Sequence, residues 1–414
     1  MDPIRLDQLS KTVLGAQHKS VPPTAWGMTI DEFLAGKPRL SQFATPLLTL
    51  DETAMSHNVT AMASWASERG MGLAPHGKTT MAPQLWRRQL EAGAWGITLA
   101  TPWQAQIARQ FGLRRIMLAN ALVDAVSLAW LTDELCSDPD FEFYCWADSV
   151  STVELMSHQL DGIVRSARPI AVLVELGFPG GRCGARSLDE ARAVAEAITR
   201  TPRLSLAGVA GYEGALGHDR SPDALTRITT YLDDMAGLHV GLRDLLPPGS
   251  LVTAGGSAFP DLVAERLAEV AANGASVVLR SGAYITHDDG FYAHISPFAD
   301  GVAPHNPVHL QPAIHGWARV ISAPEPDLAL LDAGKRDLPY DEGLPVVEQE
   351  PVDAMNDQHT FVRGKQTESM RIGDIVRLGL SHPCTAFDKW RLIPVISSHS
   401  EADPPVLDLI HTYF

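Results

Sequence analysis

The chain repeats one pattern from residue 45 to residue 286: a short apolar segment, a polar turn and an amphipathic segment. The amphipathic segments have helical period and include residues 81–94, 102–112 and 187–200. Alternating strands and helices form parallel sheets, because each helix carries the chain back across the sheet. The pattern therefore predicts an α/β fold. The apolar segments that we interpret as strands are residues 45–51, 72–78, 96–101, 114–120, 141–147, 170–177, 206–214, 251–257 and 276–282.

Eight strand–helix units close into a (β/α)8 barrel of roughly 250 residues, so this region has the length of one barrel. The helix ends are marked by Ser187, which is typical of an N-cap, and by Gly93 and Gly112, which are typical of C-caps. Nine candidate strands are one more than a barrel needs. One face of the helix predicted over 187–200 is apolar, as a helix on a sheet requires, and it carries Leu188, Ala191, Val194, Ala195 and Ile198.

The pattern changes after Tyr284. Residues 297–350 are rich in proline and lack helical periodicity, whereas residues 315–322, 374–380 and 391–397 have the pattern of antiparallel strands. We therefore predict a C-terminal, mostly β domain over residues 297–414, after a barrel domain over residues 45–296. Residues 1–44 are predicted to be a peripheral N-terminal extension with a short helix over residues 29–36.

Charge and composition exclude several classes of protein. The net charge is −16, which disfavours binding to nucleic acid or to an anionic membrane surface. No apolar run approaches the roughly 18 residues of a membrane helix, and the N-terminus lacks the apolar core of a signal peptide. The four cysteines (Cys136, Cys145, Cys183 and Cys384) form no CxxC pair. We therefore expect a reduced, cytoplasmic protein.

Reactive residues of such barrels lie at the C-terminal ends of the strands, and this rule selects Lys78, Arg182, Tyr212 and the turns at 253–257 and 281–284. A lysine amine in a site of low dielectric constant can lose its proton and condense with a carbonyl, which is how pyridoxal phosphate is held. The glycine turn at 253–257 can present N–H groups to a phosphate. Each feature has an ordinary alternative, a lysine that only reaches solvent or a merely tight turn, but together they indicate a cofactor site.

Several motifs carry a resemblance to a known family. PHGKTTMAPQLWRRQLEAGAWGITLAT, GGRCG, GYEG, TAGGS, RSGAY, NDQH and SHPCTAFDKW resemble the fold-type III pyridoxal-phosphate enzymes of the D-threonine aldolase and D-serine dehydratase family. These enzymes are distant relatives of alanine racemase, and the resemblance spans about residues 45–395. It implies that the segment at 45–51 pairs with the C-terminal domain, which leaves eight strands for the barrel.

The resemblance also implies roles for single residues. Lys78 matches the lysine that holds the cofactor covalently, Arg182 matches the arginine that bonds its phenolic oxygen, and Tyr212 matches a tyrosine beside the pyridine ring. His76 and His359 match family motifs without an assigned role, and Arg280 is open to two interpretations, a partner of the pyridine nitrogen or one half of an ion pair. The residues that match the phosphate-binding turns are Thr253, Gly255, Gly256, Ser257, Gly282 and Tyr284.

His382-Pro383-Cys384 is the second informative segment. Residues i and i+2 of a strand face the same side, so the imidazole and the thiolate can bind one metal ion. Two ligands leave positions open for water and substrate, which is typical of a catalytic metal; nitrogen and sulfur favour zinc, with manganese and magnesium as alternatives. The ordinary alternative is a buried cysteine near a surface histidine. In the family, the aldolase branch has His-x-Asp at this position and the dehydratase branch has His-x-Cys.

Other polar clusters are given no ligand role. We interpret residues 286–290 as a solvated turn, and His305, His309 and His315 as histidines of a proline-rich linker.

The sequence thus predicts a homodimeric lyase that depends on pyridoxal phosphate and a metal. It would eliminate water from a D-β-hydroxy amino acid such as D-serine, D-threonine or D-threo-3-hydroxyaspartate, with Lys78 as the base and the metal at the hydroxyl. The alternative is retro-aldol cleavage that releases glycine. A racemase and a non-catalytic carrier of pyridoxal phosphate are less favoured interpretations.

Overall fold

The computed structural model describes residues 4–163, 168–303 and 306–414 of the chain. The chain separates into two compact units, which are described one at a time. The first, the barrel unit, consists of the start of the chain with residues 63–78 and 89–282. The second, the β unit, consists of residues 5–62, 79–88 and 283–414. The predicted domain boundaries after residues 44 and 296 remain a prediction.

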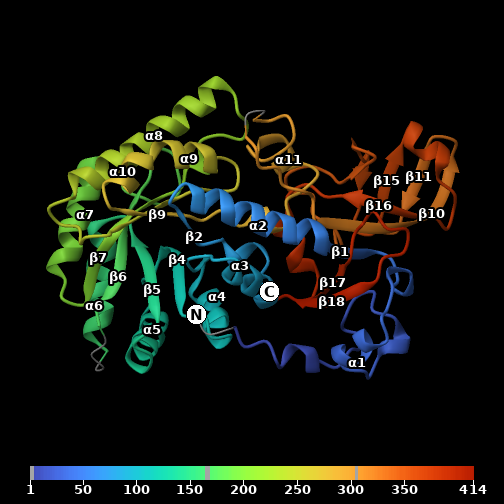
Figure 1. Cartoon of the computed structure of the whole chain (residues 1–414), viewed down its shortest axis with the longest axis horizontal. Helices are drawn as coiled ribbons and strands as arrows, with labels where there is room; N and C mark the ends of the chain where they lie inside the picture. Colours follow the sequence, from blue (N-terminus) through green and yellow to red (C-terminus); the bar gives the residue numbers. More distant parts are fainter. Residues whose placement is uncertain (1–3, 164–167, 304–305) are drawn as a thin grey trace. The chain divides into compact units, whose positions relative to one another are not determined.

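The barrel unit contains a sheet of eight parallel strands in the order β2-β9-β8-β7-β6-β5-β4-β3 (Figure 1). Every segment that was predicted to be a strand contains one, although the segment at 72–78 forms a strand of only two residues. The predicted α/β barrel architecture is therefore confirmed. The strands are β2 (Gly72–Leu73), β3 (Ile97–Leu99), β4 (Arg115–Ala121), β5 (Glu142–Ala147), β6 (Ile170–Leu176), β7 (Leu204–Gly211), β8 (Leu251–Ala254) and β9 (Ser276–Leu279).

Backbone contacts also join the two ends of this sheet. Thr98 N–H donates to the carbonyl of Pro75 at 2.9 Å, and the Thr98 hydroxyl donates to the carbonyl of Ala74 at 2.6 Å. His76 and Thr98 form an isolated parallel bridge. The segment that follows β2 is thereby held against β3, and the sheet curls into a barrel.

The interior of the barrel is filled by side chains. A buried apolar cluster takes one residue from each of seven segments at the strands, so the interior is a packed core and not a pore. Its side chains range in size from alanine to tryptophan. The cluster consists of Ala74, Met117, Trp146, Leu173, Ala210, Leu251 and Val278.

The helices begin and end where the sequence signals place them. The Ser187 hydroxyl accepts the N–H of Glu190, and Gly93 and Gly112 adopt φ values of 97° and 88°, so these three caps are confirmed. Leu188 does not face the sheet: as the first helical residue it is 44% exposed and lines a surface pocket beside Phe178. The helices are α3 (Pro83–Glu91), α4 (Pro102–Gln110), α5 (Ala125–Ser137), α6 (Val150–Asp161), α7 (Leu188–Arg200), α8 (Pro222–Gly241), α9 (Pro260–Arg266) and α10 (Ala268–Ala272).

The β unit is built around a sheet in the order β13-β12-β16-β10-β1-β17-β18, and β11, β15 and β14 extend it from β10. Strand β1 pairs antiparallel with β10 and parallel with β17, so it is not a barrel strand. The three predicted C-terminal strands are present. The strands are β1 (Leu47–Asp51), β10 (Ile314–Glu325), β11 (Leu328–Leu331), β12 (Val346–Val347), β13 (Glu350–Pro351), β14 (Ala354–Met355), β15 (Thr360–Arg363), β16 (Ile375–Gly379), β17 (Leu392–Ile396) and β18 (Val406–His411).

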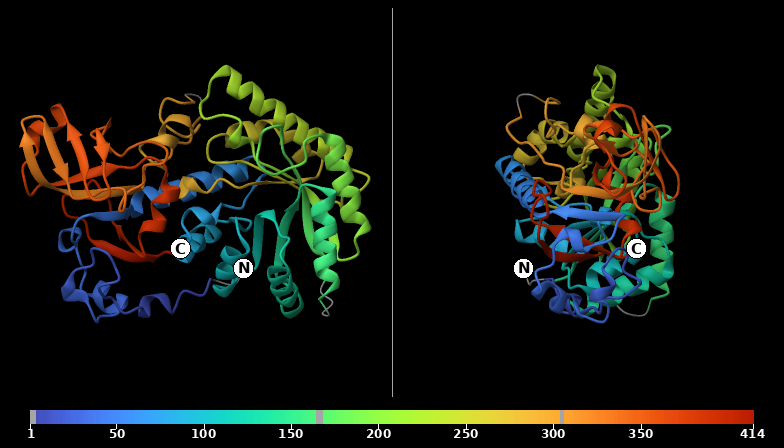
Figure 2. Two further views of the ribbon diagram at one scale, coloured as in Figure 1. Left: turned by 180° about the vertical axis from the view of Figure 1, so that it is seen from behind. Right: turned by 90° about the vertical axis from the view of Figure 1, so that its right-hand side faces the viewer.

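The N-terminal segment packs against the C-terminal strands of the same unit. The predicted short helix is present as α1 (Ile30–Ala35), and a capping box between Thr29 and Glu32 fixes its start. The backbone of residues 38–40 hydrogen-bonds residues 404–406, and Figure 2 shows the dark blue segment beside the red strands. Two further helices are α2 (Glu52–Glu68), which begins directly after β1, and α11 (Phe291–Ile295).

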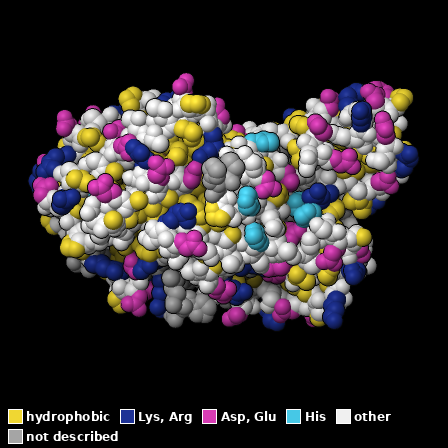
Figure 3. All heavy atoms as spheres, turned by 45° about the horizontal axis from the view of Figure 1, so that its top comes forward, with side chains coloured by type: hydrophobic (Ala, Val, Ile, Leu, Met, Phe, Trp, Pro, Cys, Tyr) yellow, Lys and Arg dark blue, Asp and Glu magenta, His cyan; other side chains and the backbone are white. Residues whose placement is uncertain are grey.

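Two properties of the structure concern binding to membranes and to nucleic acids, which the sequence disfavours. No helix in the described part of the chain is long and apolar enough to cross a membrane. On the face drawn in Figure 3, basic and acidic side chains are interspersed, so that face presents no continuous basic surface for a phosphate backbone.

Candidate functional site

Lys78 lies in a 3-10 turn, Gly77–Thr79, and is exposed. The prediction that it ends a buried strand is therefore wrong in detail. Residues 74–76 run beside the end of β9, because the N–H groups of Ala74 and His76 donate to the carbonyls of Leu279 and Arg280. The chain leaves β9 after this point and forms the 3-10 turn. The turn leaves the lysine side chain accessible to a small molecule.

His76 lies two residues before Lys78, among cations. Its Nδ1 atom is buried without a hydrogen-bond partner among the described residues. Burial lowers the pKa of His76 well below its usual value, and the positive charges of Lys78, Arg280 and Arg182 lower it further. The imidazole is therefore neutral at pH 7, and three cations lie close enough to it to repel a fourth. Such a cluster favours an anionic ligand.

Arg280 is held inside the barrel by two neighbouring strands. Its guanidinium donates to the hydroxyl of Thr253 at 2.8 Å and to the carbonyl of Gly211. Burial lowers the pKa of Arg280, while the carboxylates of Glu213 and Glu175 oppose that shift. Burial also raises the pKa of Glu175 to about 7, although Arg280 opposes it. These contacts show that Arg280 binds neutral oxygens of Thr253 and Gly211, so both interpretations of Arg280 remain predictions.

Arg182 and Tyr212 are brought together, as expected of two residues that bind one ring. The guanidinium carbon of Arg182 lies 4.7 Å from the centre of the Tyr212 ring. Arg182 is exposed in the loop after β6, and Tyr212 is half-buried directly after β7. The Tyr212 N–H donates to the hydroxyl of Tyr231 at 3.0 Å, which fixes the backbone that carries the ring.

The glycine turn after β8 binds a carboxylate that the sequence did not indicate. The N–H groups of Gly255 and Gly256 donate to the two oxygens of Glu213, at 3.0 and 2.7 Å. Glu213 is fully buried in the GYEG motif. The turn does form the anion-binding nest that its glycines suggest, but its anion is internal. The assignment of these two glycines to a phosphate therefore remains a prediction.

The turn after β9 packs closely on the segment that carries Lys78. A Cβ atom at Gly282 would lie 2.6 Å from the carbonyl oxygen of His76, so only glycine fits there. The Gly282 N–H donates to the hydroxyl of Ser257 at 3.3 Å, which joins the two predicted phosphate-binding turns. Tyr284, two residues further on, is buried in a 3-10 turn of the β unit, at 3% exposure.

Pyridoxal phosphate fits the residues of the barrel unit. The cofactor carries a phosphate and a phenolic oxygen. The charges of Lys78, Arg280 and Arg182 act on His76, whose Nδ1 atom has no hydrogen-bond partner among the described residues. Arg182 and Tyr212 form a stacked pair of the kind that can contact an aromatic ring. Lys78 would hold its aldehyde, and Ser257 and Gly282 would contact its phosphate, because the N–H groups of Gly255 and Gly256 bind Glu213.

The HPC segment is not a strand, which corrects the prediction that its alternation aligns two side chains. His382 has a φ of 68° and precedes a 3-10 turn, Pro383–Thr385. The left-handed backbone is held by Asp288, whose Oδ2 atom accepts the N–H of His382 at 3.1 Å. The imidazole nevertheless lies within hydrogen-bonding reach of the Cys384 thiol, and this hydrogen bond contributes to the raised pKa of His382.

A carboxylate orients the histidine of this turn. The Nδ1 atom of His382 lies 2.9 Å from Oδ2 of Asp341, and the hydroxyl of Thr385 donates to Oδ1 of Asp341 at 2.6 Å. Burial opposes the charged form of His382, but hydrogen bonds to Asp341 and Cys384 prevail and raise its pKa to about 10. A carboxylate on Nδ1 leaves Nε2 for a ligand, which is the usual arrangement around a metal-binding histidine. The residues thus fit a metal.

The hydroxyl of Thr79, the residue after Lys78, lies 3.4 Å from Sγ of Cys384. Both residues belong to the β unit. This contact lies within the β unit, and Thr79 is the residue that follows Lys78 in the chain.

Three expectations for other polar clusters need correction or restriction. Residues 286–288 are buried and not solvated, because the Asp288 carboxylate is enclosed by the backbone N–H groups that it accepts. His315 is not a linker residue; it lies on β10 and is fully buried.

His309 is indeed exposed, with Asp300 at 3.0 Å, whereas His305 lies outside the described residues. His359 lies exposed in the turn between β14 and β15.

Comparisons with known proteins agree with the motifs. The family model described as "Putative serine dehydratase domain" matches residues 313–396. The chain is similar to a D-threonine aldolase of an Arthrobacter species, with 27% identity over 354 residues, 84% of this chain and 88% of the relative. The resemblance to the fold-type III family of D-threonine aldolase and D-serine dehydratase, which the motifs indicated, is therefore confirmed.

Solved structures of the same group share the fold. The structure of D-threonine aldolase from Filomicrobium marinum superposes with a TM-score of 0.76 at 23% identity, over 90% of this chain and 96% of that one. A variant of D-threo-3-hydroxyaspartate dehydratase in its metal-free form superposes with a TM-score of 0.70 at 21% identity, over 91% and 100% of the two chains. The chain thus has the fold of this fold-type III family. The relatives and solved structures that it matches are named for reactions of D-hydroxy amino acids.

Proposed function

We propose that this protein is a lyase of D-β-hydroxy amino acids that uses pyridoxal phosphate and a divalent metal to remove water and, ultimately, ammonia. The contact between Thr79 and Cys384 carries the proposal, because it links the segment of the cofactor lysine to the HPC turn. Its two requirements are an anion-binding site around Lys78 and a metal-binding turn at residues 382–384. Pyridoxal phosphate, when bound, stabilises the negative charge that develops at the substrate's α-carbon.

Lys78 supplies the covalent anchor and then the base. With pyridoxal phosphate bound, the amine of Lys78 would be its covalent anchor and, once released, the base that accepts the proton from the substrate's α-carbon. Arg182 and Arg280 are cations of the same segment, and their charges act on His76 together with that of Lys78. Their positive charge also favours binding of the phosphate and of the substrate's carboxylate.

His382 and Cys384 supply the metal ligands. A divalent ion at this turn would act as a Lewis acid at the β-hydroxyl, so that hydroxide can leave. Asp341 holds the imidazole through Nδ1 and Asp288 holds its backbone, so the ligands are positioned before an ion arrives. The soft thiolate and the imidazole favour zinc over magnesium or manganese.

The same residues suit a second reaction, retro-aldol cleavage to glycine and an aldehyde. It differs in the proton that is removed, which comes from the β-hydroxyl. The Arthrobacter relative is a D-threonine aldolase, which favours this alternative. Cys384 favours the dehydratase, because His-x-Cys is the pattern that the resemblance associates with that branch. We therefore place the dehydratase first. A homodimer and a cytoplasmic location belong to the same proposal.

A product assay tests the choice directly. The protein, loaded with pyridoxal phosphate and zinc, is incubated with D-serine, D-threonine or D-threo-3-hydroxyaspartate, and ammonia, 2-oxo acid, glycine and aldehyde are measured. The dehydratase predicts equal amounts of ammonia and 2-oxo acid without glycine. Glycine in amounts equal to an aldehyde would replace it with the aldolase. Racemised substrate alone, or no turnover of the panel, would contradict both lyase reactions.

A further inference from the structure

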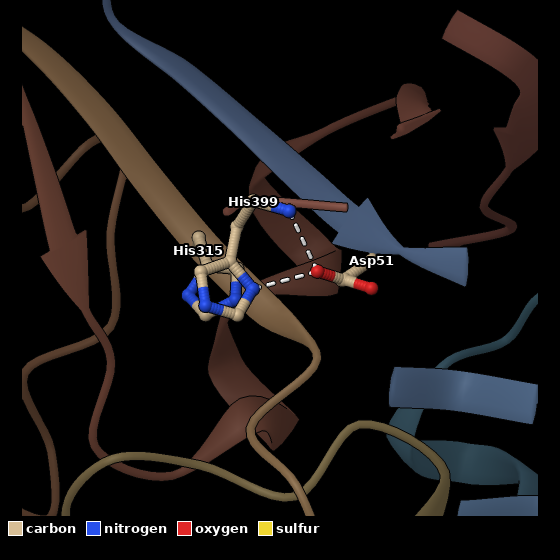
Figure 4. A group of neighbouring side chains, drawn as sticks. All are labelled: Asp51, His315 and His399. Atoms are coloured by element: carbon tan, nitrogen blue, oxygen red, sulfur yellow. Dashed lines mark hydrogen bonds and ion pairs between the residues drawn. The ribbon is translucent and has the colours of Figure 1, made fainter. Parts of the chain in front are cut away.

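A group of side chains that could hold a metal ion lies in the β unit and includes no residue of the HPC turn. It consists of Asp51, the last residue of β1, His315 on β10 and His399 in the loop after β17 (Figure 4). One potential ligand atom of each residue lies within 4.8 Å of those of the other two. Neither the motifs nor the proposed reaction uses these residues.

The backbone brings the three residues together. In the sheet, Thr49 of β1 pairs with His315, and Asp51 pairs with Ile396 of β17. The N–H of His399 donates to Oδ2 of Asp51 at 2.7 Å. Because strand pairing fixes these positions, the group is pre-organised and needs no rearrangement of the chain.

The side chains are oriented as ligands are. Nδ1 of His399 lies 2.6 Å from Oδ2 of Asp51, which fixes that imidazole through a carboxylate. The His315 and His399 rings lie side by side, with centres 4.3 Å apart. His315 is fully buried, and its Nε2 atom has no hydrogen-bond partner among the described residues. A buried polar atom without a partner is rare and indicates that something else binds there.

The charges suit a divalent cation. Burial opposes ionisation of Asp51, but its bonds from His399 and Ala54 hold its pKa at about 2, so it is negative at pH 7. Burial lowers the pKa of His315 to about 3, so its ring is neutral. Arg377 can only donate to Nδ1, which leaves the proton of the ring on Nε2, and Nε2 must release it to bind an ion. Arg377 lies 3.4 Å from His315 Nδ1 and its charge also lowers the pKa of His315, whereas Asp289 lies 3.8 Å from the same atom and burial raises its own pKa.

We propose that Asp51, His315 and His399 form a second metal site, separate from the HPC turn, that binds a divalent transition-metal ion such as zinc. Two imidazoles and one carboxylate are ligands that zinc prefers, with a fourth position left for water. Bonds of about 2.1 Å place two ligands at most about 4.2 Å apart, so the side chains draw together slightly on binding.

The ion would have a structural effect. It joins the end of β1, the start of β10 and the loop after β17, three segments far apart in the chain. The alternative is that Asp51 and His399 form only a hydrogen-bonded pair that caps α2.

The first experiment removes the HPC ligands. The full chain carrying His382→Ala and Cys384→Ala is treated with chelator, loaded with zinc, dialysed and analysed by plasma mass spectrometry. We expect one equivalent of zinc per chain and a melting temperature that zinc raises. Failure of this background to retain zinc, while it stays folded by circular dichroism, would overturn the second site and leave the HPC site untouched.

The second experiment assigns the ligands in that background. His399→Ala should abolish both the bound equivalent and the zinc-dependent rise in melting temperature. Asp51→Asn, which keeps a capping oxygen for α2, should raise the dissociation constant for zinc about 10-fold to 100-fold. His309→Ala removes an exposed histidine of the same unit and should change neither value. Zinc retained by folded His399→Ala at unchanged affinity would refute the assignment.

Discussion

The two segments that carry the proposed chemistry contain histidines with opposite properties. His76, before Lys78, is surrounded by cations, and burial and these charges lower its pKa. His382, in the HPC turn, is also largely enclosed, but Asp341 and Cys384 raise its pKa to about 10. Burial acts in the same direction on both, so the neighbours decide the result.

The difference assigns opposite ligands to the two segments. The barrel segment, with Lys78, Arg182 and Arg280, attracts an anion such as a phosphate or a carboxylate. The HPC turn, with Asp341 and Asp288 behind it, attracts a cation. A D-β-hydroxy amino acid presents both a carboxylate and a hydroxyl that must leave, and its chemistry needs one segment of each kind.

The largest effect should follow loss of the lysine. Lys78→Ala removes both the covalent anchor and the base, and loss of the base alone lowers turnover by about 10²-fold to 10⁴-fold. Borohydride treatment of the loaded protein should attach the reduced cofactor to Lys78, as read by peptide mass spectrometry. Lys365→Ala, at an exposed position of the β unit, should leave turnover and the adduct unchanged. An adduct on another lysine would contradict the assignment of the barrel segment.

The next effect separates the two segments. Cys384→Ala, or chelation, should lower turnover at least about 10²-fold, because hydroxide is a poor leaving group without a Lewis acid. The visible absorbance of bound pyridoxal phosphate should persist, since its predicted ligands Lys78 and Arg182 are untouched. Cys384→Asp supplies a harder ligand and should shift the metal preference toward manganese. Full activity of folded, metal-free Cys384→Ala would show that the HPC turn holds no catalytic ion.

The sequence predicts the repeating elements of this fold well, because helices and strands have their own periods. Strand β6 and helix α7 are evident from apolar spacing and from the Ser187 cap, and even the pairing of β1 outside the barrel follows from the family resemblance. The HPC turn was mistaken for a strand. A left-handed residue such as His382 is stabilised by Asp288, 94 positions away, and no local pattern reports such a partner.

Residues that act through distant partners were missed for the same reason. Glu213 fills the nest of Gly255 and Gly256 although 42 positions separate it from the first of them. Asp341 lies 41 positions before His382 in a proline-rich segment that shows no period. His315 was assigned to a linker although it is the first residue of the predicted strand 315–322, and the structure places it on β10. Long-range pairing is a property of the fold, and a single sequence carries no direct signal for it.

A smaller effect should follow when the carboxylate behind His382 is neutralised. Asp341→Asn keeps the shape of the side chain but removes its charge, so the pKa of His382 should fall. The affinity of the HPC turn for zinc should fall about 10-fold to 100-fold, as for other partners of metal-binding histidines. Competition with a chromogenic chelator measures it, and Asp388→Asn, at an exposed position nearby, is the control. Unchanged affinity would mean that Asp341 does not position the ligand.

The smallest effect concerns a histidine that lies in neither segment and so isolates the contribution of burial. His411 on β18 donates or accepts one bond, with the hydroxyl of Thr12 at 3.0 Å, and burial lowers its pKa to about 4. Between pH 6.5 and pH 4 the unfolded chain binds a proton at this residue that the folded chain does not, so stability falls as the pH falls through that window. Between pH 8 and pH 5 the loss amounts to about 2 kcal/mol. His411→Gln should remove that part of the pH dependence in urea unfolding, whereas His294→Gln, at an exposed position, should leave it unchanged. An equal slope in all three proteins would show that burial does not suppress protonation of His411, and it would weaken the same explanation for His76.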